Sequence, residues 1–351
     1  IIIPPQLASD VSIDLKESLV APGFIDVQLN GAFGKDFSSE EDAVEQISKN
    51  LPRYGVTSYL ATVVSSSRED YSRLLSRLQP RSGQGASLLG IHLEGPFLEK
   101  SYCGAHKESV LLSPAEFTHI EQCYESLQGV KLVTLAPELP GAMELILHLR
   151  SKGIVVAAGH TKATWQLMQS AMKQGISAAT HLFNRMAPFH HTEPGTIGAV
   201  LTNDQMFYSL IVDGVHVHPE AINLAWRAQK AGCVLISDAM AGMGLTDGIY
   251  KLGRQEVVVI KGKALLPNTQ TLAGSTLSMD AAVRNLIKYT GCTNLEALEA
   301  ASFKPAQLLG MEKTKGSLHF GADADFVVLN RNLKVESTYI AGKRVWSSDI
   351  F

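Results

Sequence analysis

The feature that most limits the fold of this chain is an alternation of short apolar segments with segments of helical periodicity between residues 24 and 237. About eight of the short segments, from residues 24–29 to residues 234–237, are mostly apolar throughout. Strands that are apolar on both faces are typical of a parallel sheet covered by helices. The alternation therefore predicts an α/β protein, and about eight strand–helix units predict a (β/α)8 barrel of the TIM type.

The order of the segments changes after residue 237. Residues 255–260 and 264–266 are predicted to form a hairpin, and helices are expected near 279–288 and 295–309. Short strands are expected near 324–329, 337–340 and 343–346, with residues 12–15 as a further candidate. We therefore expect a barrel over residues 19–310, with a hairpin insertion near 255–266, and a small β-sandwich domain from residues 1–18 and 311–351.

One helix start has a specific sequence signature. Ser38-Ser39-Glu40-Glu41 is typical of a helix that begins with a reciprocal cap, and apolar residues then recur at helical spacing up to Tyr54. Gly55 is expected to end that helix.

Composition and charge exclude several classes of protein. With 45% hydrophobic and 19% charged residues, the chain is not largely disordered. A net charge of −3 without any long block of like charge argues against a partner that is nucleic acid or an acidic membrane. No apolar run reaches the roughly 18 residues of a membrane span, and the first residues lack the features of a signal peptide. Four separated cysteines without a Cys-x-x-Cys pair indicate no disulfide framework, so we expect a cytoplasmic protein.

Polar side chains gather where the predicted strands end, which is where a barrel of this kind places its active site. Taken singly, each has a structural explanation, since a buried histidine can be satisfied by backbone groups and an aspartate often caps a helix. Their coincidence at successive strand ends favours a functional site, because several costly polar groups then converge on one mouth. The six clusters are residues 26–31, 92–97, 159–161, 180–181, 213–216 and 237–239.

Three of these residues form a metal-ligand set. Glu94, His160 and His181 supply one carboxylate and two imidazoles, which suits a catalytic Zn²⁺ or a similar ion with one open position. Asp238, at the last strand, is placed to exchange a proton with water and with a leaving nitrogen. The sequence therefore predicts hydrolysis of an amide or ester. A serine or cysteine nucleophile has weaker support, because the chain has no Gly-x-Ser-x-Gly motif.

The motifs closely resemble those of the N-acetylglucosamine-6-phosphate deacetylase family of the amidohydrolase superfamily. The resemblance runs from about Leu19 to Phe326 and covers nearly the whole chain. The motifs that carry it are residues 21–31, 92–97 (His-Leu-Glu-Gly-Pro-Phe), 104–106, 159–161, 180–184 (Thr-His-Leu-Phe-Asn), 213–216 and 272–275 (Leu-Ala-Gly-Ser).

The resemblance implies a metal-dependent barrel, usually dimeric, that removes acetate from N-acetyl-D-glucosamine 6-phosphate. It places the metal on Glu94, His160 and His181 and makes Asp238 the acid/base. It further implies that His106 contacts the amide oxygen or the sugar. The substrate-binding residues that it implies are Asn184, Arg185, His191, His216, Gly274 and Ser275.

The number of metal ions follows from a departure at the first strand. Many amidohydrolases bind a second ion there through His-x-His, whereas this chain has Gln28 and Asn30. Amide side chains are poor ligands for a borderline ion. We therefore expect one divalent ion per subunit, with Zn²⁺ as the first choice and Fe²⁺, Co²⁺ or Mn²⁺ as alternatives.

Three further differences from the family bear on phosphate binding and on the chain start. Thr192 stands where the family commonly has an arginine that reaches the phosphate in the neighbouring subunit, and losing a guanidinium removes bidentate recognition. Arg185 stands where the family usually has alanine and is a candidate to compensate. The family also carries about one more strand pair before this start, so either the chain is incomplete or its small domain is smaller.

Three alternatives remain open from the sequence. One is an amidohydrolase that acts on a different amide or N-acyl amino sugar, since fold and metal set do not fix the substrate. The others are a catalytically silent barrel and a sugar-binding module without chemistry. The complete set of Glu94, His160, His181 and Asp238 argues against both of these.

Overall fold

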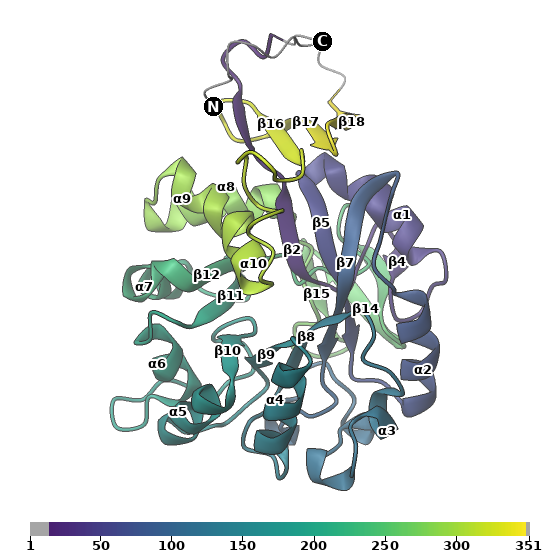
Figure 1. Ribbon diagram of the computed structural model, residues 1–351, viewed down its shortest axis with the longest axis vertical. Helices are drawn as coiled ribbons and strands as arrows, with labels where there is room; N and C mark the ends of the chain where they lie inside the picture. Colours follow the sequence, from purple (N-terminus) through teal and green to yellow (C-terminus); the bar gives the residue numbers. More distant parts are fainter. Residues whose placement is uncertain (1–13, 349–351) are drawn as a thin grey trace.

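Eight parallel strands form the centre of the computed structural model, which describes residues 14–348 (Figure 1). The strands are hydrogen-bonded in chain order, and helices or loops connect them. A short antiparallel strand, β6 (Arg81–Gly83), pairs beside β7. The eight strands are β2 (Phe24–Leu29), β5 (Val56–Val64), β7 (Gly85–Glu94), β8 (Val130–Leu135), β9 (Val155–Ala158), β10 (Ile176–Ala179), β11 (Phe207–Ile211) and β12 (Cys233–Ile236).

The sheet closes on itself where the first and the last of these strands meet. The backbone N–H of Asp238 donates to the carbonyl of Gln28 at 2.9 Å, and that of Asn30 donates to the carbonyl of Ala239 at 2.9 Å. Leu29 and Ala239 form a parallel bridge. The structure therefore confirms the expected barrel, nearly closed, with its strand ends gathered at one mouth.

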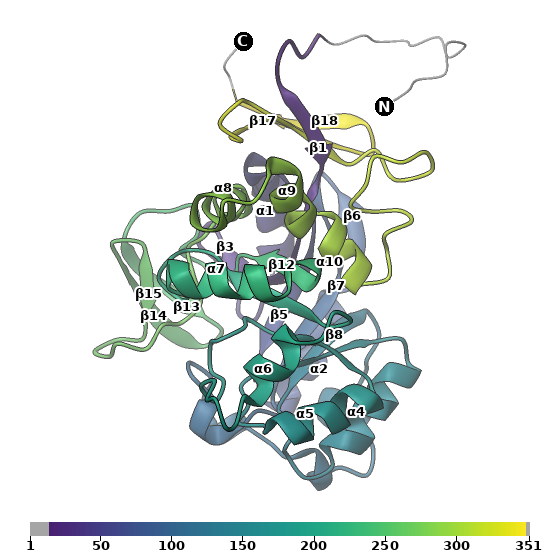
Figure 2. The ribbon, with the colours of Figure 1, turned by 90° about the vertical axis from the view of Figure 1, so that its left-hand side faces the viewer.

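The helices lie outside the strands and bury their apolar sides against them (Figure 2). In α7, for example, Ile222, Ala225 and Trp226 are buried, as expected of an amphipathic surface helix. The helices are α1 (Ala43–Asn50), α2 (Arg68–Arg77), α3 (Glu121–Tyr124), α4 (Ala142–Ser151), α5 (Trp165–Gln174), α6 (Gly195–Leu201), α7 (Pro219–Ala228), α8 (Met279–Thr290), α9 (Asn294–Ala301) and α10 (Phe303–Leu308). Short 3₁₀ turns are η1 (Leu51–Tyr54), η2 (Lys100–Tyr102), η3 (Glu108–Val110), η4 (Pro114–Glu116) and η5 (Lys230–Gly232). None of the helices within residues 14–348 combines the length and the apolar content needed to cross a bilayer.

Two helix boundaries differ from the prediction. The first helix begins at Ala43 rather than at the Ser38 cluster, because the Asp36 carboxylate accepts from Ser38 N and Ser39 Oγ and holds that cluster in a turn. The helix expected over 295–309 is two helices, α9 and α10, and Ser302 between them has a non-helical φ of −131° and ψ of −68°. Gly55 has a φ of +79° and ends the η1 turn as expected.

A three-stranded antiparallel sheet follows the barrel: β13 (Gly248–Leu252), β14 (Gln255–Ile260) and β15 (Lys263–Leu265). The hairpin of β14 and β15 was predicted, whereas β13 was not. Two of its five residues are polar or glycine and most are at least partly exposed, which leaves little apolar signal. Two shorter strands, β3 (Gly31–Ala32) and β4 (Lys35–Asp36), pair next to the mouth.

The two chain ends meet in a four-stranded antiparallel sheet in the order β1 (Leu19–Pro22), β16 (Phe326–Leu329), β17 (Val335–Ile340) and β18 (Lys343–Ser347). The described residues provide one sheet here, where a two-layered sandwich was expected. Of the strand expected near 12–15, residues 12 and 13 lie outside the described range, and residues 14 and 15 are not in a strand. β1 belongs to this sheet, so the chain enters the barrel at Phe24. The division into a barrel over 19–310 and a domain from both ends stays a proposal.

Candidate active site

The carboxyl ends of the barrel strands surround a cavity of about 640 Å³. Nine of the eleven residues predicted to bind metal, bind substrate or act in catalysis line it, although they come from distant parts of the chain. His191 and Ser275 do not line it. The nine are Glu94, His106, His160, His181, Asn184, Arg185, His216, Asp238 and Gly274.

Three site residues share an unusual backbone position. His160, His181 and Asp238 are each the second residue after a strand, β9, β10 and β12 respectively. Their φ angles are +50°, +36° and +46°, in a region that residues other than glycine rarely adopt and that costs about 1–3 kcal/mol each. Such repeated strain at one mouth fits a functional constraint on where these side chains point.

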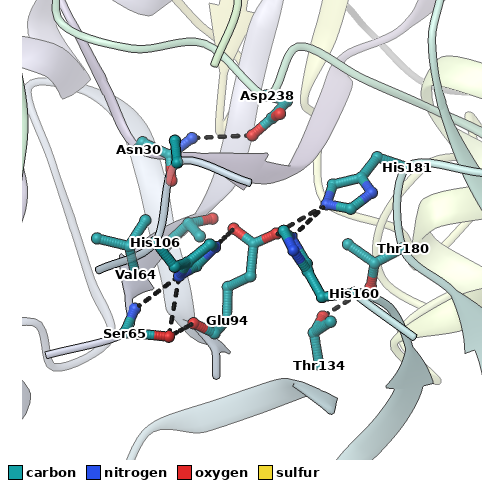
Figure 3. Close-up of polar contacts among 12 residues, drawn as sticks. Asn30, Val64, Ser65, Glu94, His106, Thr134, His160, Thr180, His181 and Asp238 are labelled. Carbon is teal, nitrogen blue, oxygen red and sulfur yellow. Dashed lines mark hydrogen bonds and ion pairs between the residues drawn. The ribbon is translucent and has the colours of Figure 1, made fainter. Parts of the chain in front are cut away.

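Glu94, His160 and His181 meet at one point within this cavity (Figure 3). His181 Nε2 lies 2.9 Å and His160 Nε2 lies 3.2 Å from Glu94 Oε1, and the two Nε2 atoms are 3.1 Å apart. All three side chains are buried, and their ligand atoms lie within 4.8 Å of one another. One carboxylate oxygen and two imidazole nitrogens are a donor set that suits a borderline divalent ion.

Neighbouring groups set the orientation and the charge of His160 and Glu94. His160 Nδ1 is 2.8 Å from the carbonyl of Tyr102, an acceptor that would hold the ring proton on Nδ1 when Nε2 binds an ion. Burial by itself would raise the pKa of Glu94, but the hydrogen bonds with His160 and His181 hold it well below the usual range. Glu94 is therefore a carboxylate at neutral pH, as a metal ligand must be.

Asp238 lies at the side of this group, two residues after the end of the last strand. Its Oδ1 accepts a hydrogen bond of 2.9 Å from Asn30 Nδ2. Burial, together with the negative charge of Glu94, raises the pKa of Asp238 to about 6. A carboxyl group with a pKa near neutrality can take and return a proton, which is what general acid/base catalysis needs.

His106 faces the ligand group from the loop after β7. Its Nε2 is 4.0 Å from Glu94 Oε2, and its ring lies edge-to-face with that of His160. The backbone N–H of Ser65 donates to His106 Nδ1 at 3.2 Å, and Ser65 Oγ is 2.9 Å from the same atom. Burial lowers the pKa of His106 to about 3, with His160 adding to the effect. His106 is therefore neutral, with its proton on Nε2, and can donate into the cavity.

Ser65 was missed by the sequence reasoning. It directly follows β5, the second barrel strand, whereas the polar clusters considered were those after the first, third, fifth, sixth, seventh and eighth strands. A search of every strand end would have found it. Arg254 and Asp70, which pair at 2.5 Å beside the cavity, were also missed and lie on elements outside the barrel strands.

The residues expected to bind substrate lie in different surroundings. His216 Nδ1 bonds to Asp213 Oδ2 at 2.6 Å. The Arg185 side chain packs over Gly104, where an added Cβ would lie 2.7 Å from Arg185 Nε. The Gly274 backbone has a φ of +69°, and the hydroxyl of Ser275 donates to the carbonyl of Ser237 at 2.5 Å. Ser275 thus supports the segment that carries Asp238.

The loop with His191 and Thr192 is exposed and lies outside the cavity of its own chain. Thr192 Oγ1 bonds to His190 Nδ1 at 2.8 Å, and the rings of His190 and His191 lie 4.2 Å apart. These side chains are therefore available at the surface rather than directed at Glu94.

A barrel with one buried carboxylate, two histidine donors and an aspartate on its last strand is the architecture of a metal-dependent amidohydrolase. Comparison with known proteins agrees: residues 19–345 match the amidohydrolase family. The chain belongs to this family and, within it, to the N-acetylglucosamine-6-phosphate deacetylases, as relatives at high coverage show.

Three relatives illustrate this similarity. N-acetylglucosamine-6-phosphate deacetylase of Rattus norvegicus is 46% identical over 355 residues, which cover 97% of this chain and 87% of the relative. N-acetylgalactosamine-6-phosphate deacetylase of Escherichia coli is 38% identical over 330 residues, covering 93% and 87%. A solved structure of mutant N-acetyl-D-glucosamine-6-phosphate deacetylase from Mycobacterium smegmatis, in complex with N-acetyl-D-glucosamine-6-phosphate, has a TM-score of 0.88 and 35% identity over 97% of this chain and 91% of that chain.

Proposed function

We propose that this protein hydrolyses N-acetyl-D-glucosamine 6-phosphate to D-glucosamine 6-phosphate and acetate. The observation that carries the proposal is the convergence of Glu94, His160 and His181 at one point, with Asp238 beside them. Relatives that bear this activity in their names cover almost the whole chain, which supports the same assignment.

One divalent ion on Glu94, His160 and His181 is part of the proposal. When bound, such an ion polarises a carbonyl and lowers the pKa of water toward about 7. Zn²⁺ fits the two imidazoles and one carboxylate best, with Fe²⁺, Co²⁺ or Mn²⁺ as alternatives. Gln28 offers only an amide here, and its Nε2 already donates to Glu94 Oε1 at 3.2 Å, which favours one ion over two.

The residues of the chain have separate tasks in this reaction. Asp238 takes a proton from the attacking water and delivers it to the nitrogen as the C–N bond breaks. His106 donates its Nε2 proton to the amide oxygen, where negative charge develops in the transition state. Ser65 holds His106 in the tautomer that this donation requires.

The phosphate is assigned to the mouth of the cavity, near Asn184, Arg185 and His216. Gly274 also lines the cavity, and Ser275 supports the segment that carries Asp238. Arg254 also lines the cavity, but its guanidinium is paired with Asp70, whereas Arg185 forms no ion pair within residues 14–348. Arg185 is therefore the guanidinium that is free to bind an anionic group.

The assembly and compartment are proposed on separate grounds. A homodimer would let the exposed loop with His191 and Thr192 approach a partner's substrate, as the family resemblance implies. Cys103, Cys123, Cys233 and Cys292 are all unpaired. Free thiols support a reducing compartment, the cytoplasm.

Acetate release by the purified, Zn²⁺-loaded protein tests the proposal. N-acetylglucosamine 6-phosphate should be cleaved faster than its unphosphorylated form, and faster than N-acetylgalactosamine 6-phosphate, the substrate in the name of one relative. Asp238→Asn should lose most of its activity in the same assay, while Asn223→Ala, at a partly exposed position of α7, is the matched control. If N-acetylgalactosamine 6-phosphate were cleaved faster, it would replace the glucosamine derivative as the assigned substrate. If no N-acyl amino sugar released acetate, the proposal would be overturned.

A further inference from the structure

Asn30 occupies a fixed position at the closing edge of the barrel. It directly follows β2, its backbone N–H donates to Ala239, and its carbonyl accepts from Phe37 N at 3.1 Å. Only 3% of the residue is exposed, yet it lines the cavity. A side chain held this firmly presents its amide group to the site without the entropy cost of ordering it on binding.

The orientation of the Asn30 amide follows from its partner. Asp238 is an acceptor as a carboxylate, so the NH₂ group of Asn30 must face it, and the 2.9 Å contact joins Nδ2 to Asp238 Oδ1. The carbonyl oxygen Oδ1 therefore points the other way. Figure 3 shows this oxygen directed away from Asp238, toward the part of the site that holds His106 and Glu94.

Asn30 Oδ1 is buried and has no hydrogen-bond partner among the described residues. An unsatisfied buried acceptor destabilises the folded chain, because the oxygen has lost its hydrogen bonds to water without replacement. Such a cost at a cavity wall is removed when a bound molecule supplies a donor. The oxygen of the Asn30 amide is thus available to accept a hydrogen bond from a ligand, while the NH₂ group of the same amide holds Asp238.

We propose that Asn30 Oδ1 accepts the N–H of the amide that is cleaved, while Nδ2 holds Asp238. The inference rests on the proposed function and adds a contact to the reacting nitrogen. One side of the Asn30 amide would then hold the N–H and the other side Asp238, which sets the reacting nitrogen relative to the acid that protonates it. As the C–N bond breaks, the nitrogen takes the proton from Asp238, which returns to its carboxylate form, and the products are a free amine and acetate.

Two uncleavable analogues of the proposed substrate, used as inhibitors of the Zn²⁺-loaded enzyme, test the contact. One is the N-methylsulfonyl analogue, which keeps the N–H. The other is the methyl ketone with a CH₂ group in place of the N–H. Asn30→Ala should raise Ki for the sulfonamide about 3- to 10-fold and change Ki for the ketone less than about twofold, as expected for the loss of one hydrogen bond.

A crystal structure of the wild-type sulfonamide complex tests the same contact without a variant, and it should place the inhibitor nitrogen within hydrogen-bond distance of Asn30 Oδ1. Equal changes in both Ki values, or a nitrogen that contacts other atoms only, would overturn the role of Asn30 and leave the proposed function intact. If the wild-type enzyme bound neither analogue and released no acetate, the proposed function itself would fail, and this inference with it. Asn223→Ala serves again as the amide-loss control.

Discussion

Ser237 Oγ donates a hydrogen bond of 2.5 Å to Asp26 Oδ2 and so joins the last barrel strand to the first, one residue before Asp238. Asp26 Oδ1 also accepts from the backbone N–H groups of Ser237 and Gln28. Burial nevertheless raises the pKa of Asp26 to about 7. At the seam of the barrel, where the first and last strands meet, the Asp26 carboxyl group therefore binds its proton more tightly in the folded chain than in the unfolded one.

The first prediction concerns stability at this seam. Because the pKa of Asp26 is raised from 3.8 to about 7 on folding, the unfolded chain releases this proton first as the pH rises. Asp26 therefore makes a contribution to stability that decreases between about pH 4 and pH 7. Asp26→Asn has no such proton, so the melting temperature of this variant relative to wild type should be higher at pH 7.5 than at pH 5. A difference that is constant or falls with pH would contradict the assignment.

The second prediction is one tightly bound divalent ion per chain. Elemental analysis of active protein should give one equivalent, with zinc favoured, and His160→Ala or His181→Ala should lose it. Removal of one ligand from a three-residue set leaves the ion weakly held, so chelator resistance should disappear together with activity. Two equivalents in active protein, or anomalous density away from Glu94, would contradict the single site.

The third prediction concerns the acid/base group. Asp238→Asn should retain fold and metal while kcat falls by about 10² to 10⁴, because an amide cannot titrate. In wild type, protonation of Asp238 removes the base, so kcat/KM should fall as the pH drops below about 6, the pKa that burial gives this residue. A bound cation favours the carboxylate form of Asp238, so the fall in kcat/KM on the acidic side then occurs at lower pH. If Asp238→Asn contained its full complement of metal and kept a near-normal kcat, another group would have to move the proton.

The barrel was predictable because its strands are apolar on both faces and its helices are periodic on one. Two features escaped prediction because contacts, rather than the apolar pattern, shape them. Asp36 captures the Ser38 turn that would otherwise start a helix, and the partly exposed β13 depends on pairing with β14 rather than on its own apolar pattern. The Asp36 contact is local but overrides the helix signal of the residues that follow it, and the pairing of β13 with β14 is not visible in the pattern of β13 itself.

The grouping of the proposed metal ligands and Asp238 could be predicted from the sequence because each stands at the end of a recognisable strand or just after it. The contacts that these residues make with their neighbours could not be predicted from the sequence. That Ser65 fixes His106, or that Asn30 holds Asp238 with one side of its amide, depends on the register between strands. The sequence also left open which sugar fills the cavity, since similar ligand sets serve many amides.

The fourth prediction is a homodimer whose partner subunit completes the substrate site. Thr192 and His191 lie outside the cavity of their own chain, so a direct contact of these side chains with substrate in the cavity is expected from a second chain. Light scattering should give a dimer, and specific activity should fall on dilution below its dissociation constant. A monomer that is fully active at nanomolar concentration would refute the shared site.

The fifth prediction separates two ways of binding the phosphate. A sugar phosphate carries close to two negative charges at pH 7, and Arg185 is the free guanidinium at the mouth of the cavity. Arg185→Ala should therefore raise KM for N-acetylglucosamine 6-phosphate by about 5- to 150-fold, which corresponds to about 1–3 kcal/mol for a charge-assisted pair. The unphosphorylated sugar should be cleaved as before, and Arg227→Ala, on the exposed side of α7, should change neither KM.

Thr192→Arg provides the complementary measurement, because it adds a guanidinium to the loop that is expected to reach substrate from a partner subunit. In a dimer it should lower KM for the phosphorylated sugar and partly restore the Arg185→Ala variant, since a second charge-assisted pair substitutes for the first. In a monomer it should change nothing. If neither variant alters KM for the phosphorylated sugar, and the unphosphorylated sugar is cleaved equally well, then phosphate is not what this cavity recognises, and the substrate is a different amide.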